Sequence, residues 1–484
     1  MKKFIFLIIS FCLIFPFMAC QIDSDYLDEI KAKIDTDDNP PEEETPSEEP
    51  PSEEPPSDET LPDYGFDVTL EITHAGGGEI FLSWIEPADS AYDHVEITWN
   101  PDGTTGTNVS KGTTSYTITG LTQFIEYTIT AKAVSNSGVK SNGDSIFIYL
   151  PLTPIDIYCI STVSEIIAIN TDTTTLSRSY ILTEDVDLSQ AVWTPIGFGS
   201  DFTGIFNGNL HNIINLNISN PSISGQGFFA EVSGKITNVN LTGIQVSGLD
   251  YVGGIAAKVL AGGLVKNCSV SGTVSGQEFV GGIIGEIIDG SILNCHSSVT
   301  VSGQAEIGGV AGFVNSSSTT LSSSSGPVGG TASTVGGLIG ITNFGSTVTS
   351  CYSTSAVSGS ISFSGGLIGV NYDTDVEQCY ATGSINGGSG TEIGGLIGHC
   401  GSGSVSNCYS TGNVSGSNIL GGLIGNNLVS VSNCYAAGDV PTSVATCGGL
   451  IGASTGTYSD CFYDKDVSGH VTASLIGETA LTTA

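Results

Sequence analysis

Basic residues are scarce in this sequence of 484 residues. It contains 12 Lys and Arg against 49 Asp and Glu, which gives a formal net charge of −37. Proteins bind nucleic acids and anionic membrane surfaces through a basic footprint. The composition therefore excludes nucleic acid as a partner, and it excludes attraction to an acidic lipid surface.

Residue sets that carry catalysis or hold metals are also sparse. The six histidines never come within ten residues of one another, so no local histidine-based metal motif is visible. The sequence has no G-x-S-x-G nucleophile signature. Its nearest acidic cluster is Asp373, Asp375 and Glu377, which we interpret as a solvated loop. We predict no enzyme activity, no cofactor and no metal site.

Long apolar runs are absent, apart from one at the N-terminus. Residues 1–20, MKKFIFLIISFCLIFPFMAC, combine two lysines, an apolar run too short to span a membrane and a small residue before Cys20. This pattern predicts a signal peptide over residues 1–19. Its end resembles a bacterial lipobox, which implies that Cys20 carries a lipid that anchors an exported protein to the membrane. Phe17 stands where that motif usually has Leu, so cleavage after Ala19 without a lipid is the alternative.

An acidic, proline-rich segment follows the proposed anchor. Residues 21–63 carry 17 acidic and 2 basic residues, and they include the run PPEEETPSEEPPSEEPPSDETLPD. Proline favours the polyproline II conformation and like charges repel, so the segment is expected to be extended. We predict a lipid-anchored linker over residues 20–63.

Residues 64–150 alternate apolar and polar side chains in short runs. EIFLSWI, YDHVEITW, SYTITGL and EYTITAKAVS fit the strands of a two-sheet sandwich. The segment resembles a fibronectin type III domain, with Trp84 as the buried tryptophan of the second strand and Leu121 and Tyr127 in its leucine-to-tyrosine corner. The resemblance implies either a recognition module or a spacer, and we favour the spacer.

A glycine pair recurs at a fixed interval over the second half of the chain. The first residues of these pairs are separated by 28, 27, 28, 29, 29, 27 and 27 residues, and they are Gly253, Gly281, Gly308, Gly336, Gly365, Gly394, Gly421 and Gly448. Such a period is the signature of a solenoid. We predict an all-β chain, in which the sandwich is followed by a parallel β-helix (β-solenoid) of about 28-residue coils with three strands each.

The repeats have a recognisable core motif. GGIIG at 281–285 and GGLIG at 336–340, 365–369, 394–398, 421–425 and 448–452 resemble the GLUG repeat. The resemblance implies a secreted or surface-exposed protein, often adhesin-like. We predict irregular opening coils over 151–250 and GLUG-type repeats over 251–463. The segment 464–484 resembles the closing cap of such proteins.

One cysteine occupies the same position in seven of the eight repeats. The column consists of Cys268, Cys295, Cys351, Cys379, Cys408, Cys434 and Cys461, and Ser322 replaces the cysteine in the remaining repeat. Stacked parallel side chains point the same way, whereas a disulfide or a zinc site needs converging groups. We therefore predict a column of small buried residues rather than redox or metal chemistry. The asparagine that precedes several of these cysteines is predicted to form a hydrogen-bonded corner ladder.

An aromatic residue follows the cysteine in five repeats. These residues are Tyr352, Tyr380, Tyr409, Tyr435 and Phe462. Successive side chains of a strand face opposite ways, so a buried cysteine implies an outward aromatic ring. The four tyrosines are our candidate ligand contacts, through stacking on sugar rings. The alternative is that corners interrupt the alternation and the tyrosines pack under loops.

These features favour a bacterial protein displayed at the cell surface or outer membrane. Its expected role is non-catalytic, adhesin-like binding or scaffolding, with a glycan or an extracellular host or matrix protein as ligand. The alternatives are a polysaccharide-processing β-helix enzyme and a non-catalytic fragment of a larger secreted peptidase.

Overall fold

The computed structural model describes residues 68–87, 91–100, 105–123, 125–150, 155–359, 362–470 and 478–481. The predictions for the signal peptide, for lipidation at Cys20 and for the linker lie outside these ranges. Within them, no helix combines the length and apolar character that a membrane span requires.

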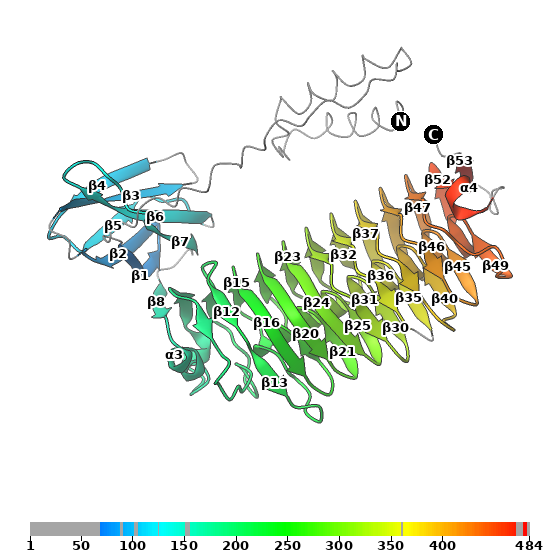
Figure 1. Ribbon diagram of the computed structural model, residues 1–484, viewed down its shortest axis with the longest axis horizontal. Helices are drawn as coiled ribbons and strands as arrows, with labels where there is room; N and C mark the ends of the chain where they lie inside the picture. Colours follow the sequence, from blue (N-terminus) through cyan, green and yellow to red (C-terminus); the bar gives the residue numbers. More distant parts are fainter. Residues whose placement is uncertain are drawn as a thin grey trace, which may run out of the picture. The chain divides into compact units, whose positions relative to one another are not determined.

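Residues 68–150 form a sandwich of two antiparallel sheets (Figure 1). One sheet contains β1 (Thr69–Gly76), β2 (Glu79–Ile85) and β5 (Ser115–Thr119), and it continues through the pairing of β1 with β8 (Ile155–Ile160) into the strands that follow. The other is built from β3 (Tyr92–Asn100), β4 (Thr105–Ser110), β6 (Glu126–Ser135) and β7 (Asp144–Tyr149). Strand β2 alternates exposed and buried residues, as the period-2 sequence pattern requires.

The residues that suggested the fibronectin type III fold occupy the expected places in the sandwich. Trp84 and Tyr127 are buried, and Leu121 packs against the same core. The backbone N–H of Thr122 donates to the Tyr127 hydroxyl over 2.9 Å, and that hydroxyl donates back to the Thr122 carbonyl over 3.4 Å. These bonds form the corner that the sequence predicted.

In the rest of the described chain, short strands stack in parallel from coil to coil and form four sheets (Figure 1). We name these sheets A to D in the order in which one coil passes through them. Sheet A contains β17 (Val252–Gly253), β21 (Glu278–Gly281), β25 (Ala305–Gly308), β30 (Thr334–Gly336), β35 (Phe363–Gly365), β40 (Glu392–Gly394), β45 (Ile419–Gly421) and β49 (Thr446–Gly448). Sheet B contains β14 (Phe229–Val232), β18 (Ala256–Val259), β22 (Ile284–Ile288), β26 (Ala311–Asn315), β31 (Ile339–Asn343), β36 (Ile368–Asn371), β41 (Ile397–Cys400), β46 (Ile424–Asn427) and β50 (Ile451–Ser454).

The other two sheets complete each coil. Sheet C contains β8 (Ile155–Ile160), β9 (Ser179–Leu182), β11 (Ile205–Asn207), β15 (Lys235–Thr237), β19 (Leu264–Lys266), β23 (Ser291–Leu293), β27 (Ser318–Thr320), β32 (Ser346–Thr349), β37 (Thr374–Glu377), β42 (Gly403–Ser406), β47 (Ser430–Ser432) and β51 (Thr457–Ser459). Sheet D contains β10 (Val186–Asp187), β12 (Asn212–Ile214), β13 (Asn217–Ser219), β16 (Asn240–Ser247), β20 (Ser269–Ser275), β24 (His296–Gly303), β28 (Ser323–Ser324), β29 (Val328–Gly330), β33 (Tyr352–Ser353), β34 (Val357–Ser358), β38 (Tyr380–Ala381), β39 (Ile385–Asn386), β43 (Tyr409–Ser410), β44 (Val414–Ser415), β48 (Tyr435–Ala436), β52 (Cys461–Asp464) and β53 (Glu478–Leu481).

The predicted fold class, a fibronectin type III-like sandwich followed by a parallel β-helix of about 28-residue coils, is confirmed. The prediction of three strands per coil is wrong, because a full repeat such as 392–415 contributes β40, β41, β42 and the pair β43 and β44. The string IGGLIG looks continuous in the sequence. In the structure its glycine pair is the bend between β40 in sheet A and β41 in sheet B.

Glycine is required at this bend because the backbone of the next coil lies against it. A Cβ atom on Gly395 would lie closer than 3.0 Å to the carbonyl oxygen of Gly422, and one on Gly394 would overlap the carbonyl oxygen of Ile397. The same overlap with the next glycine pair recurs at Gly337 and Gly366. The motif therefore marks a close approach of backbones rather than a loop that reaches for a ligand.

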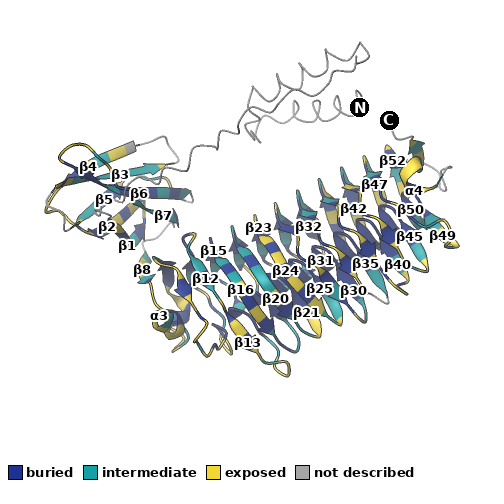
Figure 2. Ribbon diagram, in the orientation of Figure 1, coloured by how far each residue is buried: buried dark blue, intermediate teal, exposed yellow. Residues whose placement is uncertain are grey.

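Aliphatic residues from all four sheets fill the interior of the coils, as the dark strands of Figure 2 show. Leu396 and Ile397, which follow the glycine pair, are fully buried. The opening coils add an aromatic cluster in which Phe206 meets Phe228 and Phe229 edge-on at 5.6 Å.

Three short helical segments lie near the ends of the solenoid. They are α3 (Val163–Ala168), a 3-10 turn (Thr175–Ser177) and α4 (Lys465–Ser468). Thr162 and Glu165 form a capping box at the start of α3. Beyond α4, strand β53 pairs with β52 and extends sheet D by one strand.

Candidate functional site

The four candidate tyrosines form one column on sheet D. Tyr352, Tyr380, Tyr409 and Tyr435 start strands β33, β38, β43 and β48, and each is the direct register partner of the next. Phe462 in β52 continues the column. We call the four tyrosines the tyrosine ladder. The residue after each tyrosine is buried, so the rings lie on the outer side of the sheet.

The rings of the ladder stack on one another. The centroids of Tyr352 and Tyr380 are 4.9 Å apart with an interplanar angle of 4°, and Tyr380 and Tyr409 repeat both values. Tyr380 therefore has both ring faces against its neighbours. The ladder presents ring edges and hydroxyl groups along its length, and a ring face is accessible at its ends.

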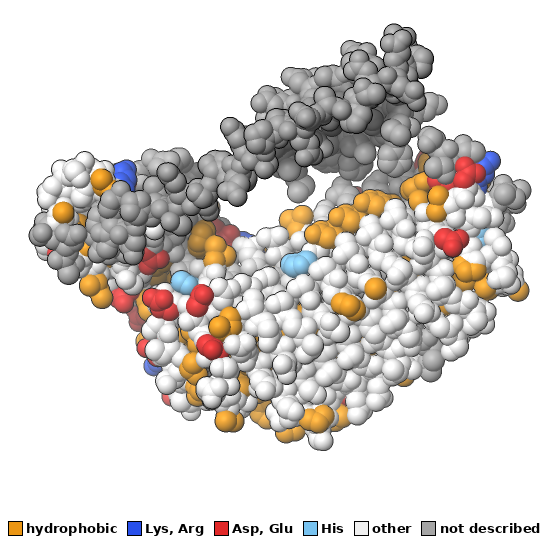
Figure 3. Space-filling model, viewed as in Figure 1, with side chains coloured by type: hydrophobic (Ala, Val, Ile, Leu, Met, Phe, Trp, Pro, Cys, Tyr) orange, Lys and Arg blue, Asp and Glu red, His pale blue; other side chains and the backbone are white. Residues whose placement is uncertain are grey.

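Exposure differs among the rings. Tyr409 has 39% of its surface exposed, whereas the other three tyrosines are half-buried. Burial raises the pKa values of Tyr380, Tyr409 and Tyr435 above the ordinary value of 10.0. The hydroxyls are therefore protonated at neutral pH and can both donate and accept hydrogen bonds. Figure 3 shows hydrophobic side chains in a row along the C-terminal half of the solenoid, on a surface that is mostly uncharged.

The column continues toward the N-terminus with polar residues. Ser323 pairs with Tyr352, and His296 pairs with Ser323. The imidazole Nδ1 of His296 lies 2.8 Å from the Ser323 hydroxyl, and burial lowers the pKa of His296. The aromatic part of the column therefore begins at Tyr352.

The cysteine column is buried beneath sheet D. Every cysteine in the described ranges is free, and all seven column members are at most 2% exposed. The backbone N–H of Cys379 donates to the sulfur of Cys408 over 3.4 Å, and the thiol of Cys379 donates to the Glu377 carbonyl over 3.1 Å. The predicted buried packing is confirmed, with hydrogen bonds that the sequence did not reveal.

Ser322 takes over the same hydrogen bonds where it replaces cysteine. Its hydroxyl accepts from the N–H of Cys295 over 3.1 Å and donates to the Thr320 carbonyl over 2.9 Å. Its own N–H donates to the sulfur of Cys351. A small side chain with one donor and one acceptor is what this position requires.

The asparagines before the cysteines lie at left-handed corners. Asn267 and Asn294 have φ values of 53° and 51°, and the Asn294 amide donates to the Asn267 side-chain oxygen over 3.0 Å. Asn267 in turn donates to Asn238 over 3.1 Å. The predicted corner ladder is confirmed for this part of the column.

The interpretation of the acidic cluster as a loop is wrong for Asp375 and Glu377, which belong to strand β37. Asp375 and Glu377 lie on the exposed side of β37, and Asp375 accepts a hydrogen bond from the Ser404 hydroxyl. Among the described residues, no three His, Cys, Asp or Glu side chains are grouped so that they could hold a metal ion.

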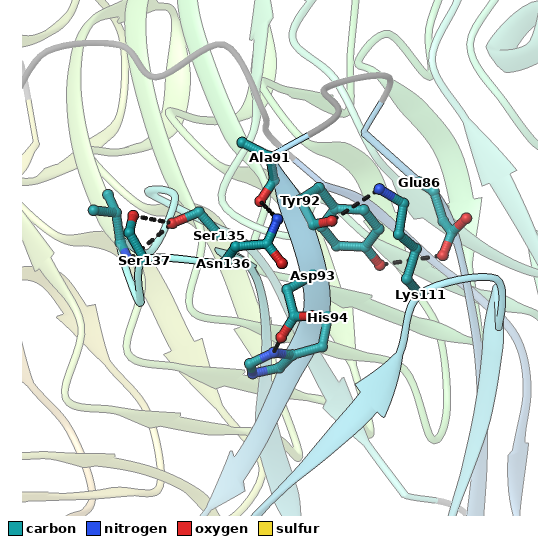
Figure 4. A network of polar contacts seen from close by, with 10 residues as sticks. Glu86, Ala91, Tyr92, Asp93, His94, Lys111, Ser135, Asn136 and Ser137 are labelled. Atoms are coloured by element: carbon teal, nitrogen blue, oxygen red, sulfur yellow. Dashed lines mark hydrogen bonds and ion pairs between the residues drawn. The ribbon is translucent and has the colours of Figure 1, made fainter.

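One end of the sandwich carries a polar network, drawn in Figure 4. The Tyr92 hydroxyl donates to Glu86 over 3.2 Å, and Lys111 donates to the Tyr92 carbonyl over 2.8 Å. Burial and the nearby Glu86 carboxylate raise the pKa of Tyr92 to about 12. Asn136 donates to the Ala91 carbonyl over 3.0 Å. These bonds tie neighbouring loops to one another, which suits a spacer module.

A second cluster of functional side chains was missed by the sequence reasoning. It consists of Phe363, Glu392, His399 and Asn426 on the strands that meet at the bend between sheets A and B, together with Tyr372, which follows β36 at the other end of sheet B and contacts His399. These residues come from successive coils and are up to 63 positions apart in the chain. Only their shared position within the 28-residue period could have indicated that they meet.

Two family models match the chain. The fibronectin type III domain model matches residues 67–148, and the GLUG motif model matches residues 248–275 and 364–386. A stretch of 156 residues is 33% identical to Halomucin from Haloquadratum walsbyi. That match covers 29% of this chain, and the chain spans 2% of the length of Halomucin.

Matches among solved structures include a candidate immunoglobulin A1 protease from Bacteroides ovatus and the pectate lyase PelI from Erwinia chrysanthemi. The first is 19% identical, with 68% of this chain and 84% of that chain covered and a TM-score of 0.33. The second is 10% identical, with 66% and 88% covered and a TM-score of 0.14. These values carry no argument about activity. The domain matches fit a surface or binding protein and suggest a non-catalytic role.

Proposed function

We propose that this chain is an exported, non-catalytic binding protein of the adhesin type, displayed at the cell surface through a lipid at Cys20. In this proposal the tyrosine ladder is the contact surface and a glycan is the ligand. The extended acidic linker holds the folded part away from the membrane, and the sandwich acts as a spacer.

The tyrosine ladder is the observation that carries this proposal. It places four aromatic rings in register on an outer surface with few charges. Because the rings stack on one another, sugar hydroxyls would bond to the row of tyrosine hydroxyls, and a sugar ring would stack only at an end of the ladder. This differs from the ring-by-ring stacking that the sequence suggested.

A glycan array probed with the mature chain, residues 20–484, tests the proposal. Tyr380→Ala and Tyr409→Ala are each expected to weaken binding to the recognised glycan about tenfold, because each removes a stacking partner and a hydroxyl worth roughly 1–1.5 kcal/mol. Phe344→Ala is the matched control, since Phe344 is 63% exposed and lies outside the ladder.

The same preparation distinguishes binding from catalysis. Bound glycans are recovered and analysed for shortened products, and proteins are screened for cleavage. Turnover of any bound glycan or protein contradicts the non-catalytic role and favours the enzyme alternative. Unchanged binding by both tyrosine variants removes the ladder as the contact surface.

A further inference from the structure

Sheets A and B meet at a bend where outward-facing side chains touch. Glu392 in β40 and His399 in β41 lie on opposite sides of the glycine pair Gly394–Gly395, and the Glu392 carboxylate is 2.6 Å from the His399 Nδ1 atom. The Phe363 ring, one coil earlier in sheet A, lies 5.6 Å from the same imidazole. Contact between outer side chains across a bend means that the outer faces of the two sheets converge. We call this bend the re-entrant corner.

The re-entrant corner continues toward the N-terminal coils. Lys258 in β18 lies over the Tyr251 ring, with its Nζ atom 3.7 Å from the ring centroid. Tyr251 stacks on Phe279 at 4.9 Å, and Phe279 meets Phe313 of sheet B edge-on at 5.7 Å. Aromatic rings therefore line the corner in these N-terminal coils as well, beside the Lys258 ammonium group.

The side chains around His399 hold its imidazole in one orientation. Nδ1 engages Glu392, whose other oxygen accepts from the Asn426 amide over 3.1 Å. Within the described ranges, the Nε2 atom of His399 makes no hydrogen bond. Phe363 and Tyr372 flank the imidazole with centroids 5.6 Å and 5.7 Å away, and Tyr372 is 41% exposed. Nε2 is the ring nitrogen left for a hydrogen bond to a ligand, and it lies between two aromatic rings.

We propose that the re-entrant corner is a second binding surface, and that it takes an uncharged, linear glycan. His399 Nε2 accepts a hydrogen bond from a sugar hydroxyl, while Phe363 and Tyr372 contact the sugar ring. The hydrogen bonds among Glu392, His399 and Asn426 fix the orientation of the imidazole, so little conformational entropy is lost on binding. This surface lies on a different pair of sheets from the tyrosine ladder and stands independently of it.

The charge of the protein decides against anionic sugars. The chain has a net charge of −37, and the Glu392 carboxylate already has two partners at this site. A uronic acid or sulfated sugar would be repelled, and a cation would have to displace the imidazole or the amide. A neutral sugar is not repelled, and it binds without displacing the imidazole or the amide.

The length of the corner indicates a chain of sugars rather than a single one. The register runs from Lys258 through Glu286, Phe313, Ile341 and Val370 to His399. Val370 is buried, so a ligand would contact the side chains on either side of it. Five steps between neighbouring strands span about 24 Å at about 4.8 Å each. A ligand that contacts both ends must be an oligosaccharide of several units.

Affinity electrophoresis of the mature chain in gels that contain soluble β-glucan, mannan, xylan or polygalacturonate tests the proposal. We expect retardation by at least one neutral polysaccharide and none by polygalacturonate. His399→Ala and Tyr372→Ala are each expected to weaken that binding about tenfold. Tyr372→Ala changes an exposed side chain, so it remains informative if His399→Ala impairs folding. Phe81→Ala is the matched control, since Phe81 is an exposed aromatic residue of the sandwich and lies on neither proposed surface.

Three results would overturn the inference. The first is retardation by polygalacturonate alone or by none of the four polysaccharides. The second is retardation that Tyr409→Ala abolishes while His399→Ala and Tyr372→Ala retain it, which would support the proposed function but remove this second surface. The third is equal affinity, by calorimetry, for the disaccharide and the hexasaccharide of the retarding polysaccharide.

Discussion

At the scale of single residues, the glycine pairs are set by the backbone of the neighbouring coil. The first glycine of a pair faces a carbonyl of its own coil, and the second faces the carbonyl of the glycine that follows in the next coil. Neither position has room for a methyl group. The pairs therefore recur in every regular coil for a steric reason, independently of any ligand.

Gly395→Ala is expected to destabilise the solenoid by about 1–3 kcal/mol, because the new methyl group overlaps the Gly422 carbonyl in a close-packed interior. Gly329→Ala is the matched control, since a Cβ there meets Ser358 only at 3.6 Å and beyond. Thermal unfolding followed by circular dichroism gives the comparison. Equal melting temperatures for the two variants would show that the coil spacing relaxes around the extra atom.

At the scale of elements, the corner between sheets C and D requires a left-handed residue in each regular coil. Asparagine or another polar residue occupies most of these corners, but Leu321 adopts φ 52° with 42% of its surface exposed. A residue other than glycine, asparagine or aspartate is disfavoured in this conformation by roughly 1–2 kcal/mol. The coil with Ser322 therefore has two atypical residues side by side.

Leu321→Asn is expected to stabilise the protein by about 1 kcal/mol, because asparagine tolerates the left-handed region and would stand beside Asn294 in the corner ladder. The control is Leu428→Asn, since Leu428 is similarly exposed at 45% and its φ is negative. Urea unfolding midpoints measure the difference. If Leu428→Asn raises the unfolding midpoint as much as Leu321→Asn does, the gain in stability comes from the more polar surface and not from the backbone conformation.

At the scale of the whole molecule, the core of the solenoid depends on neutral thiols. Burial raises the pKa of Cys400 from 9.0 to about 12, and it also raises the pKa of Cys447 above 9.0. In the unfolded chain these thiols ionise near pH 9. Their contribution to stability is therefore fully present below pH 9 and is lost as the pH rises from about 9 to 12.

The free energy of unfolding is accordingly expected to fall above pH 9, by up to about 1.4 kcal/mol per pH unit for each such thiol. Cys400→Ser removes one titrating group, so its loss of stability between pH 9 and 11 should be smaller than that of the unmodified chain. Urea unfolding at a series of pH values measures both slopes. Identical slopes would mean that Cys400 does not ionise on unfolding in this range.

The features that could be predicted from the sequence differ from those that could not in one respect. The sandwich, the solenoid, the buried cysteines and the Asn267–Asn294 ladder were predictable, because each depends on local alternation or on a period that is visible in the sequence. The number of strands per coil was not predictable, because IGGLIG does not reveal that its glycines form a bend. The stacking of Tyr352, Tyr380 and Tyr409 on one another also depends on ring orientation, which spacing alone leaves open.

The amino-acid order by itself determined the coil length, the inward side of each strand and the positions where only glycine fits. These properties depend on side-chain size and on the alternation of a strand, and both are local. The tertiary structure decided which outer side chains meet. Parallel stacking brings residues about 28 positions apart to within about 5 Å, and the angle at each glycine pair makes the bend between sheets A and B re-entrant. That angle is set by the packing of the whole coil, and through it Glu392, His399, Phe363 and Asn426 come together.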